Sequence, residues 1–373
     1  SIEVIRLWEI PAEQLLRCSC LLSSRWTVMA PLGLPELFFP RSSGDDVMQP
    51  MTTRRQFLGH ATALGAGWVA ARGLVTEAAT EQRASKMRVT IRDAHLKATE
   101  APDSWTALER IGAEGMEAII DEQLALPQVF HPQETYSAAT DADRQHLKRR
   151  MEASGQRITA FCMFNRFEER PEFEVEWCQK IAEVARDLQV VAIRIDVVPR
   201  KMDQAAFLQH AIAVLKQVIA ATEGTGARFA IENHGRLTND PDFLAPLLEG
   251  VGSDRLGLTL DTANFYWFGH PLSRLYEIYE QFASRTFHTH CKSIRYPEDQ
   301  REQQRPMGWR YADFHAPIYE GDIDFARVLA ILKRAGYQDD LCIESASYRG
   351  LPGPEVVAMF SKEVDMLKGL RAA

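Results

Sequence analysis

From Met87 onward, short apolar runs alternate with longer stretches in which apolar residues recur every three or four positions. The short runs predict strands, and the longer stretches predict amphipathic helices. The predicted strands are 88–95, 117–121, 158–164, 190–198, 228–233, 256–261, 286–292 and 341–346. The predicted helices are 104–113, 141–154, 172–187, 203–222, 240–249, 272–283, 323–335 and 354–369. This alternation is typical of α/β proteins, and eight strand–helix pairs predict a single (β/α)8 TIM barrel over residues 87–373.

Four of these strands carry a side chain that can bind a metal at or near their C-terminal end. Glu232 ends the run RFAIE, Asp261 ends LGLTLD, His290 ends TFHTH and Glu344 ends LCIE. The intervals from Glu232 to Asp261 and from Asp261 to His290 are each 29 residues, which is the length of one strand–helix unit. Because parallel strands end at the same edge of a barrel, the four side chains predict one divalent-metal site.

The pattern leaves the identity of the histidine ligand open. His288 and His290 lie on the same face of their strand, so either can be the ligand while the other supports it or contacts the substrate. Three carboxylates and one imidazole favour Mn²⁺ or Mg²⁺, with Co²⁺ or Zn²⁺ as alternatives. Taken singly, each of these residues has a simpler explanation as a loop, cap or structural side chain, and the shared spacing favours the metal site.

One connection, residues 293–321, is much longer than the others, and it is polar and aromatic. Loops of this length inside a compact domain are usually either functional or disordered. Since this loop follows the strand that ends near His290, we expect it to lie over the barrel mouth.

Composition narrows the function classes. The chain has 373 residues, a net charge of −8 and a pI of about 5.8, which argues against a protein that follows a nucleic-acid backbone. Its six cysteines form no CxxC pair, and we expect those in the barrel segments to be buried free thiols.

Residues 51–80 resemble a twin-arginine export signal. The motif Thr53–Leu58 (TRRQFL) precedes an apolar run over 57–71, and small residues follow that run. The run is too short to span a bilayer by the usual length rule, so we expect no stable membrane span in the mature protein. The expected location is periplasmic or otherwise extracytoplasmic.

Residues 1–50 show no clear period. Because a signal peptide begins a chain, Met51 is the expected start of translation. The first fifty residues are then expected to be a non-native or disordered leader without a role in the fold.

The segments IENHGRLTNDP, LGLTLDTANF, HTHCKS and EGDIDFARVLAILKRAGYQDDLCIES resemble the sugar phosphate isomerase/epimerase family, which has a xylose isomerase-like TIM barrel. The resemblance covers most of residues 88–370. It implies that Glu232, Asp261, His290 and Glu344 bind the metal. It also implies that the two glutamates act as the acid/base pair.

The mechanism implied by this family is proton abstraction next to a carbonyl, through an enediolate. Lys292, two residues beyond His290, is placed to neutralise the negative charge that develops. The ketose 3-epimerases of the family carry a histidine where this chain has Asn264, and the ENHG motif is closer to the dehydratase and isomerase branches. A lyase or dehydratase acting on a keto-sugar, keto-inositol or glycoside is therefore the alternative.

Most of the residues expected to contact substrate lie close in sequence to the metal ligands, and Arg194 lies on the fourth predicted strand. The expected contacts are His234, Arg236, Asn264, His288 and Arg194. His95 and Asp196 are further candidates at the mouth, and Trp267, Trp309 and Tyr311 are either sugar-stacking or packing residues.

Two other functions compete with the isomerase. An endonuclease of the same fold uses a three-zinc cluster and needs more strand-end histidines than this chain offers, and a sugar-binding barrel without activity would be expected to lose its ligands. The expected partners are therefore a small-molecule sugar or polyol, with no nucleic acid, and a homodimer is a further expectation because barrels of this family often pair.

Overall fold

The computed structural model describes residues 87–373. The leader expected over 1–50 and the export signal expected over 51–80 lie outside the described residues. Within the described part, no helix is both long and apolar enough to cross a membrane.

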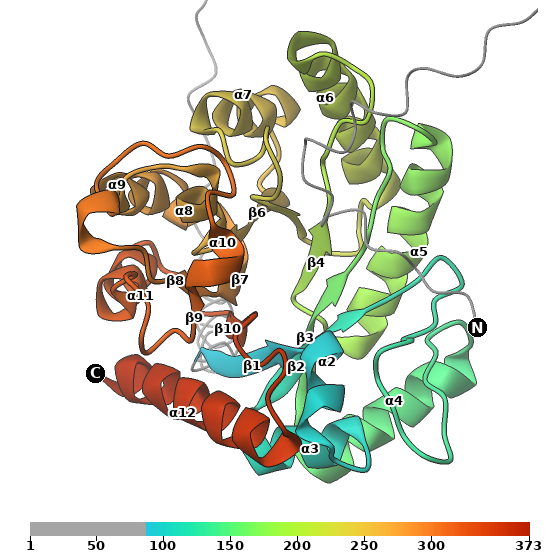
Figure 1. Cartoon of the computed structure of the whole chain (residues 1–373). Helices are drawn as coiled ribbons and strands as arrows, with labels where there is room; N and C mark the ends of the chain where they lie inside the picture. The colour runs from blue at the N-terminus through green and yellow to red at the C-terminus, as the bar shows by residue number, and fades with distance from the viewer. Residues whose placement is uncertain (1–86) are drawn as a thin grey trace, which may run out of the picture. The chain divides into compact units, whose positions relative to one another are not determined.

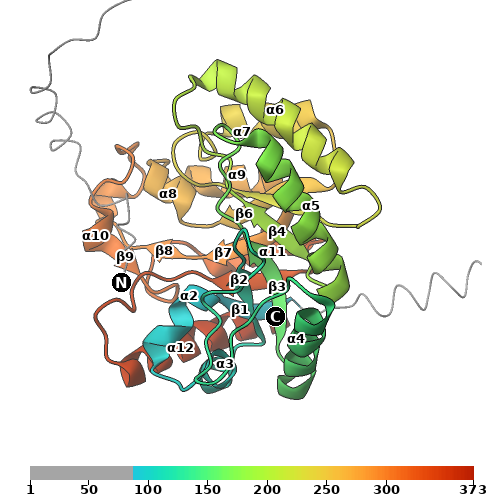
Figure 2. The same cartoon turned by 90° about the vertical axis from the view of Figure 1, so that its right-hand side faces the viewer.

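Eight parallel strands form a closed barrel, in the spatial order β1-β10-β7-β6-β5-β4-β3-β2. The strands are β1 (Arg88–Arg92), β2 (Gly115–Ile119), β3 (Arg157–Cys162), β4 (Ala192–Ile195), β5 (Phe229–Glu232), β6 (Leu256–Asp261), β7 (Thr286–Cys291) and β10 (Asp340–Ile343). Helices surround the barrel in both views (Figures 1 and 2). The predicted (β/α)8 barrel is thus confirmed.

The helices that follow the eight barrel strands match the predicted segments. They are α3 (Ser104–Ile111), α4 (Asp141–Ser154), α5 (Pro171–Leu188), α6 (Gln204–Ala221), α7 (Pro241–Val251), α9 (Leu272–Phe282), α11 (Phe325–Arg334) and α12 (Gly353–Ala372). The helix starts at Asp203 and Asp240 follow from capping, because each aspartate accepts backbone N–H bonds from the first turn.

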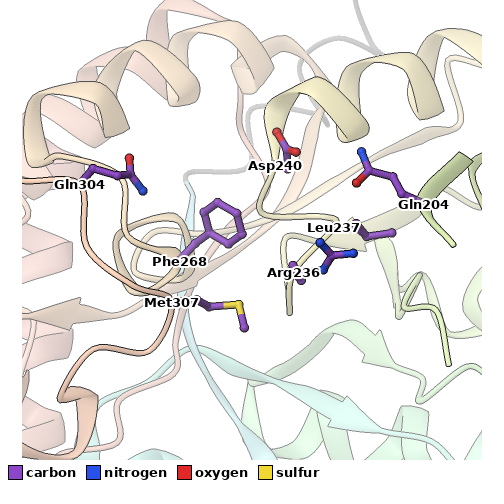
Figure 3. Close-up of a pocket in the computed structure, with 7 residues that line it drawn as sticks. All are labelled: Gln204, Arg236, Leu237, Asp240, Phe268, Gln304 and Met307. Atoms are coloured by element: carbon purple, nitrogen blue, oxygen red, sulfur yellow. The ribbon is translucent and has the colours of Figure 1, made fainter. Parts of the chain in front are cut away.

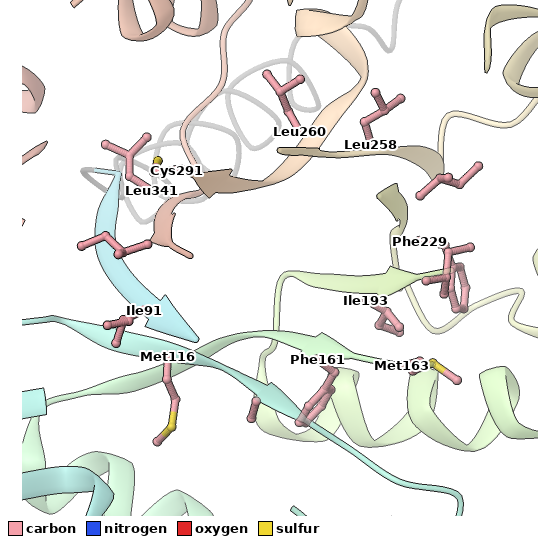
Figure 4. Close-up of a cluster of buried hydrophobic side chains, with 14 of the residues drawn as sticks. Ile91, Met116, Phe161, Met163, Ile193, Phe229, Leu258, Leu260, Cys291 and Leu341 are labelled. Atoms are coloured by element: carbon pink, nitrogen blue, oxygen red, sulfur yellow. The ribbon is translucent and has the colours of Figure 1, made fainter. Parts of the chain in front are cut away.

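Apolar strand residues form the layer between the barrel and its helices. Figure 4 shows this layer, which includes Ile91, Met116, Phe161, Ile193, Phe229 and Leu258. Since side chains alternate along a strand, the intervening positions point into the barrel. Those positions hold buried polar residues such as Thr90, Glu117, Arg194, Thr259 and His288.

Two local predictions differ from the structure. The second strand begins at Gly115 instead of residue 117, and a Cβ at Gly115 would lie 2.2 Å from the carbonyl oxygen of Arg157. The glycine therefore permits the close approach of β3, which an apolar pattern does not reveal. His95, placed on the first strand by the sequence, lies instead in the short helix α2 (Asp93–Leu96).

The long connection after β7 has a structure of its own. It contains β8 (Ser293–Ile294) and β9 (His315–Ala316), which pair antiparallel, and the short helix α10 (Tyr311–Phe314). Figure 2 shows these elements, together with α8 (Asn264–Phe268), on the side where β6 and β7 end. The loop therefore lies at the barrel mouth, as expected.

A buried carboxyl group on α12 ties this loop to the barrel wall. Glu363 is fully buried and accepts a hydrogen bond of 3.0 Å from the backbone N–H of Ile318. Burial raises the pKa of Glu363 from its ordinary value of 4.5 to about 8, although the bonds from Ile318 and Ser345 lower it in part. The folded protein therefore keeps a proton that the unfolded chain releases.

This raised pKa predicts a pH-dependent stability difference for Glu363→Gln. The free energy of unfolding of the wild type should fall as pH rises from about 4.5 to about 8, because the unfolded chain binds fewer protons there. In Glu363→Gln the amide oxygen still accepts the hydrogen bond, but the side chain does not titrate. The free energy of unfolding of the variant, measured relative to the wild type, should therefore rise by about a few kcal/mol between pH 5 and pH 9. Urea unfolding at both pH values measures this. Glu355→Gln, on the exposed part of the same helix, is the control, and equal pH trends for both variants would contradict the prediction.

Candidate metal centre

The four predicted ligands meet at the C-terminal end of the barrel. Glu232, Asp261 and His290 lie at the ends of β5, β6 and β7, and Glu344 directly follows β10. Asp261 lies opposite His290 in the register of β6 and β7. One ligand atom from each of the four residues lies within 4.8 Å of the others. Strands that are far apart in sequence thus bring four metal-binding groups to one place.

The two carboxylate oxygens of Asp261 differ in their hydrogen bonding. Its Oδ1 accepts the backbone N–H groups of Ala263 and Asn264, each at 2.8 Å, as α8 begins. Its Oδ2 is buried and receives no hydrogen bond from the described residues, while Lys292 Nζ lies 3.6 Å away. Burial, with the charges of Glu344 and Glu232, raises the pKa of Asp261 to about 7 although Lys292 opposes the shift. An unsatisfied buried oxygen is costly, and a cation would satisfy it.

His290 lies between the two glutamates. Its Nδ1 is 3.3 Å from Glu232 Oε1 and 3.1 Å from Glu344 Oε2. Its Nε2 is 2.9 Å from Glu117 Oε2 on β2. If Nε2 carries the proton, it donates to Glu117 and leaves the Nδ1 lone pair facing the glutamates. This is the usual support for a metal-binding histidine.

Two arginines form ion pairs with the glutamates and offset their negative charge. Arg194, on β4, donates from Nε to Glu232 at 2.7 Å, and Arg92, on β1, pairs with Glu344. Burial alone would raise the pKa of Glu232, but Arg194 and His290 lower it far below its ordinary value. The pKa of Glu344 is also lowered, because Lys292 and Arg92 outweigh burial. Both glutamates are therefore ionised at neutral pH.

Three carboxylates and one imidazole, with Asp261 Oδ2 unsatisfied, fit a divalent cation. Two other groups in the described part have ligand atoms as close together. In the group of Asp196, Glu232 and His234, the Arg194 guanidinium already binds both carboxylates. In the group of Glu117, His288 and Cys342, Glu117 already pairs with His290. The four-residue group is therefore the candidate metal centre.

Some expected substrate contacts lie at this centre, together with Lys292, which was expected to neutralise developing charge. Asn264 Nδ2 is 3.2 Å from Glu232 Oε1, and Lys292 Nζ is 3.6 Å from Glu344 Oε2. Burial would lower the pKa of Lys292, but Glu344 and Asp261 raise it well above its ordinary value. His234 Nδ1 is 3.3 Å from Asp196 Oδ1, and both side chains are partly exposed.

The three other expected substrate contacts lie in different surroundings. His288 is fully buried, and its Nδ1 is bound to Asp340 at 2.7 Å, so it supports the barrel interior instead of reaching the mouth. Arg194 is 2% exposed and is occupied by Glu232 and Asp196. Arg236 is exposed and lines a hollow at the side of the mouth.

Sequence reasoning missed two members of the site, Glu117 and Arg92. Arg92 Nε lies 3.1 Å from Glu117 Oε2, so this pair joins β1 to β2 beneath Glu344 and His290. A charged residue inside the apolar run GMEAII was the available signal for Glu117. Placing the strand at 117–121 put Glu117 at its start and hid that signal.

The Glu117 contact predicts that Glu117→Gln weakens metal binding by about 10- to 100-fold, because the histidine loses its charged acceptor. Competition with a chelator measures the affinity for Mn²⁺ and Zn²⁺. Glu109→Gln, on the exposed face of α3, is the matched control and should bind as the wild type does. An unchanged affinity in Glu117→Gln would show that His290 is held in place by other groups.

Solved structures share this fold at low sequence identity. The IOLI protein with a bound zinc atom gives a TM-score of 0.57 at 19% identity, covering 76% of this chain and 99% of its own. A D-tagatose 3-epimerase-like protein gives 0.50 at 16% identity, with coverages of 76% and 99%. Mannonate dehydratase from Streptococcus suis serotype 2 gives 0.55 at 12% identity, with coverages of 76% and 94%.

Sequence comparison agrees with the fold. An uncharacterized protein of Methanocaldococcus jannaschii is 24% identical over 169 residues, which are 44% of this chain, so the match spans about half (53%) of that relative. A family model described as a xylose isomerase-like TIM barrel matches residues 105–370, well over half of the chain. The chain therefore belongs to the xylose isomerase-like TIM barrel family.

Proposed function

We propose that the protein is a divalent-metal-dependent sugar isomerase or epimerase that removes a proton next to a carbonyl and passes through an enediolate. The observation that carries this proposal is that Glu232 and Glu344 both approach His290 Nδ1, at 3.3 and 3.1 Å. Two carboxylates at one metal centre can serve as a general base and, once one of them has taken up a proton, as a general acid.

The two glutamates exchange one proton with the substrate. One ionised carboxylate accepts the proton from carbon, and the other, after it takes up a proton from solvent, returns one to the opposite face or to the neighbouring carbon. Arg194 holds Glu232 and Arg92 holds Glu344, so each carboxylate keeps its direction during the transfer. A divalent ion, when bound by Glu232, Asp261, His290 and Glu344, supplies a Lewis acid for the substrate oxygens.

Lys292 and the residues around it stabilise charge and bind hydroxyls. The Lys292 ammonium lies between Asp261 and Glu344, each at 3.6 Å, and can donate to the oxygen on which negative charge develops. We expect His234 and Asn264 to contact hydroxyl groups of the substrate. Mn²⁺ or Mg²⁺ suits this oxygen-rich ligand set best, with Co²⁺ or Zn²⁺ as alternatives.

The proposed substrate is a small sugar or polyol and not a nucleic acid. A twin-arginine signal at 51–80 would place the enzyme in the periplasm or outside the cytoplasm, where free sugars and glycosides are available. A homodimer is proposed only because barrels of this family often pair.

A lyase or dehydratase is the second candidate. Two observations favour it, the amide of Asn264 beside Glu232 and the fold shared with a mannonate dehydratase. The first step is the same proton removal. The two candidates separate afterwards, when a lyase expels the group β to the new carbanion.

Proton abstraction predicts exchange with solvent deuterium. In D₂O with saturating metal, the wild type should incorporate deuterium next to the carbonyl of D-fructose, D-tagatose or a 3-keto-glucoside, as read by NMR. Glu344→Gln should slow this exchange by at least about 100-fold, because a general base contributes that much. Metal content measured on the same samples separates a lost base from a lost ion.

The products distinguish the two candidate reactions. An epimer or isomer supports the isomerase, and a deoxy-keto product or a released alcohol supports the lyase. Glu320→Gln, in the loop after β7, serves as the control and should exchange at the wild-type rate. The absence of exchange and of product with all three compounds in metal-loaded wild type would contradict the proposed chemistry for these substrates.

A further inference from the structure

A hollow of about 270 Å³ opens at the side of the barrel mouth (Figure 3). Its walls come from segments that follow β4, β5, β6 and β7, the same end of the barrel as the metal centre. The residues that line it are Gln204, Arg236, Leu237, Asp240, Phe268, Gln304 and Met307. Substrates of barrel enzymes bind at this end, so the hollow lies on the functional side.

Three segments run from the metal centre to the hollow. In the segment after β5, His234 is partly exposed beside Asp196, and Arg236 lines the hollow two residues later. In α8, Asn264 donates to Glu232 at one end and Phe268 lines the hollow at the other, about 6 Å away at 1.5 Å per residue.

The third segment is the long loop. Lys292 Nζ lies 6.0 Å from the ring of Tyr311, and Met307 lines the hollow four residues earlier. All three segments therefore connect the metal centre to the lining of the hollow.

The outer wall is fixed in place by a buried arginine. Arg305, between Gln304 and Met307, is 4% exposed and donates to the carbonyl oxygens of Tyr266 and His270 at 3.2 and 2.9 Å. Its guanidinium also lies over the Tyr266 ring, 4.5 Å from the centroid. A Cβ at Gly269 would lie 2.0 Å from the Arg305 carbonyl oxygen, so only glycine permits this approach. These contacts hold the loop after β7 against α8, so this side of the hollow has a fixed position.

The lining has an apolar part and a polar part. Phe268, Leu237 and Met307 present apolar surface, while Arg236, Asp240, Gln204 and Gln304 supply hydrogen-bonding groups. A hydroxylated ring has the same division, with apolar faces and a polar edge. The volume lies just below the roughly 300–1,000 Å³ of whole small-molecule sites, so it suits one ring.

We propose that this hollow binds a second, hydroxylated ring that is joined to the reacting sugar by a glycosidic bond. The natural substrate is then a glycoside and not a free monosaccharide. This inference rests on the proposed function, because it takes the metal centre as the site of the first ring.

The test compares ligands with one and two rings on the Mg²⁺-loaded protein. Dissociation constants are measured by ligand-observed NMR for D-glucose, cellobiose and 4-nitrophenyl β-D-glucopyranoside. At least one two-ring compound should bind ten-fold or more tightly than glucose. Tighter cellobiose indicates a sugar as the second ring, and tighter nitrophenyl glucoside indicates an aromatic one.

A filling variant tests the place of binding. Met307 is 47% exposed, so Met307→Trp can fill the hollow without disturbing the core. Met307→Trp should abolish the tighter binding of the two-ring compounds relative to glucose and leave the affinity for glucose unchanged. Leu351→Trp, at a residue that is 38% exposed and lies outside the hollow, should keep the gain.

The outcomes separate this inference from the proposed function. Two-ring compounds that bind no more tightly than glucose, or a gain that survives Met307→Trp, would overturn the second-ring site. Failure to bind any of the three compounds would overturn it too. A protein that shows the gain but binds no divalent ion would keep the second-ring site and overturn the metal-dependent function.

Discussion

The arrangement of this site depends on the balance of buried charge inside the barrel. Glu232, Glu344 and Glu117 are held by Arg194 and Arg92, and removing one partner of such a pair costs about 3–5 kcal/mol. Asp261 is the exception, because its Oδ2 has only a distant ammonium and its pKa is raised to about 7. A bound divalent cation would supply the charge that this carboxylate lacks.

The barrel supplies this balance through geometry. Inward side chains on β1, β2, β4, β5 and β7 pair with one another across the interior. Rigid strands hold the charged groups, while the segments beyond their ends face the substrate. The long connection after β7 joins the two roles, since Tyr311 lies over Lys292 and Arg305 fixes the wall of the neighbouring hollow.

The sequence predicted the barrel and the place where the four candidate ligands meet, because both leave periodic signals. Apolar runs marked the strands, and Glu232, Asp261, His290 and Glu344 recurred at strand ends. The sequence did not predict Glu117 or Arg92, because their contacts cross the barrel between residues as far apart as 117 and 290. The sequence also did not show that His288 lies inside the barrel and not at its mouth. Alternation along a strand tells which face a residue lies on but not its depth along the barrel axis.

The most direct test is the number of divalent ions bound per chain, measured by mass spectrometry of metals after reconstitution with Mn²⁺, Mg²⁺, Co²⁺ or Zn²⁺. The wild type should bind one ion at the four-residue centre. Asp261→Asn keeps an oxygen for the N–H groups of Ala263 and Asn264 but loses the charge, so it should lose the ion while remaining folded. A wild type that binds no ion, or a folded Asp261→Asn that binds it equally well, would contradict the account.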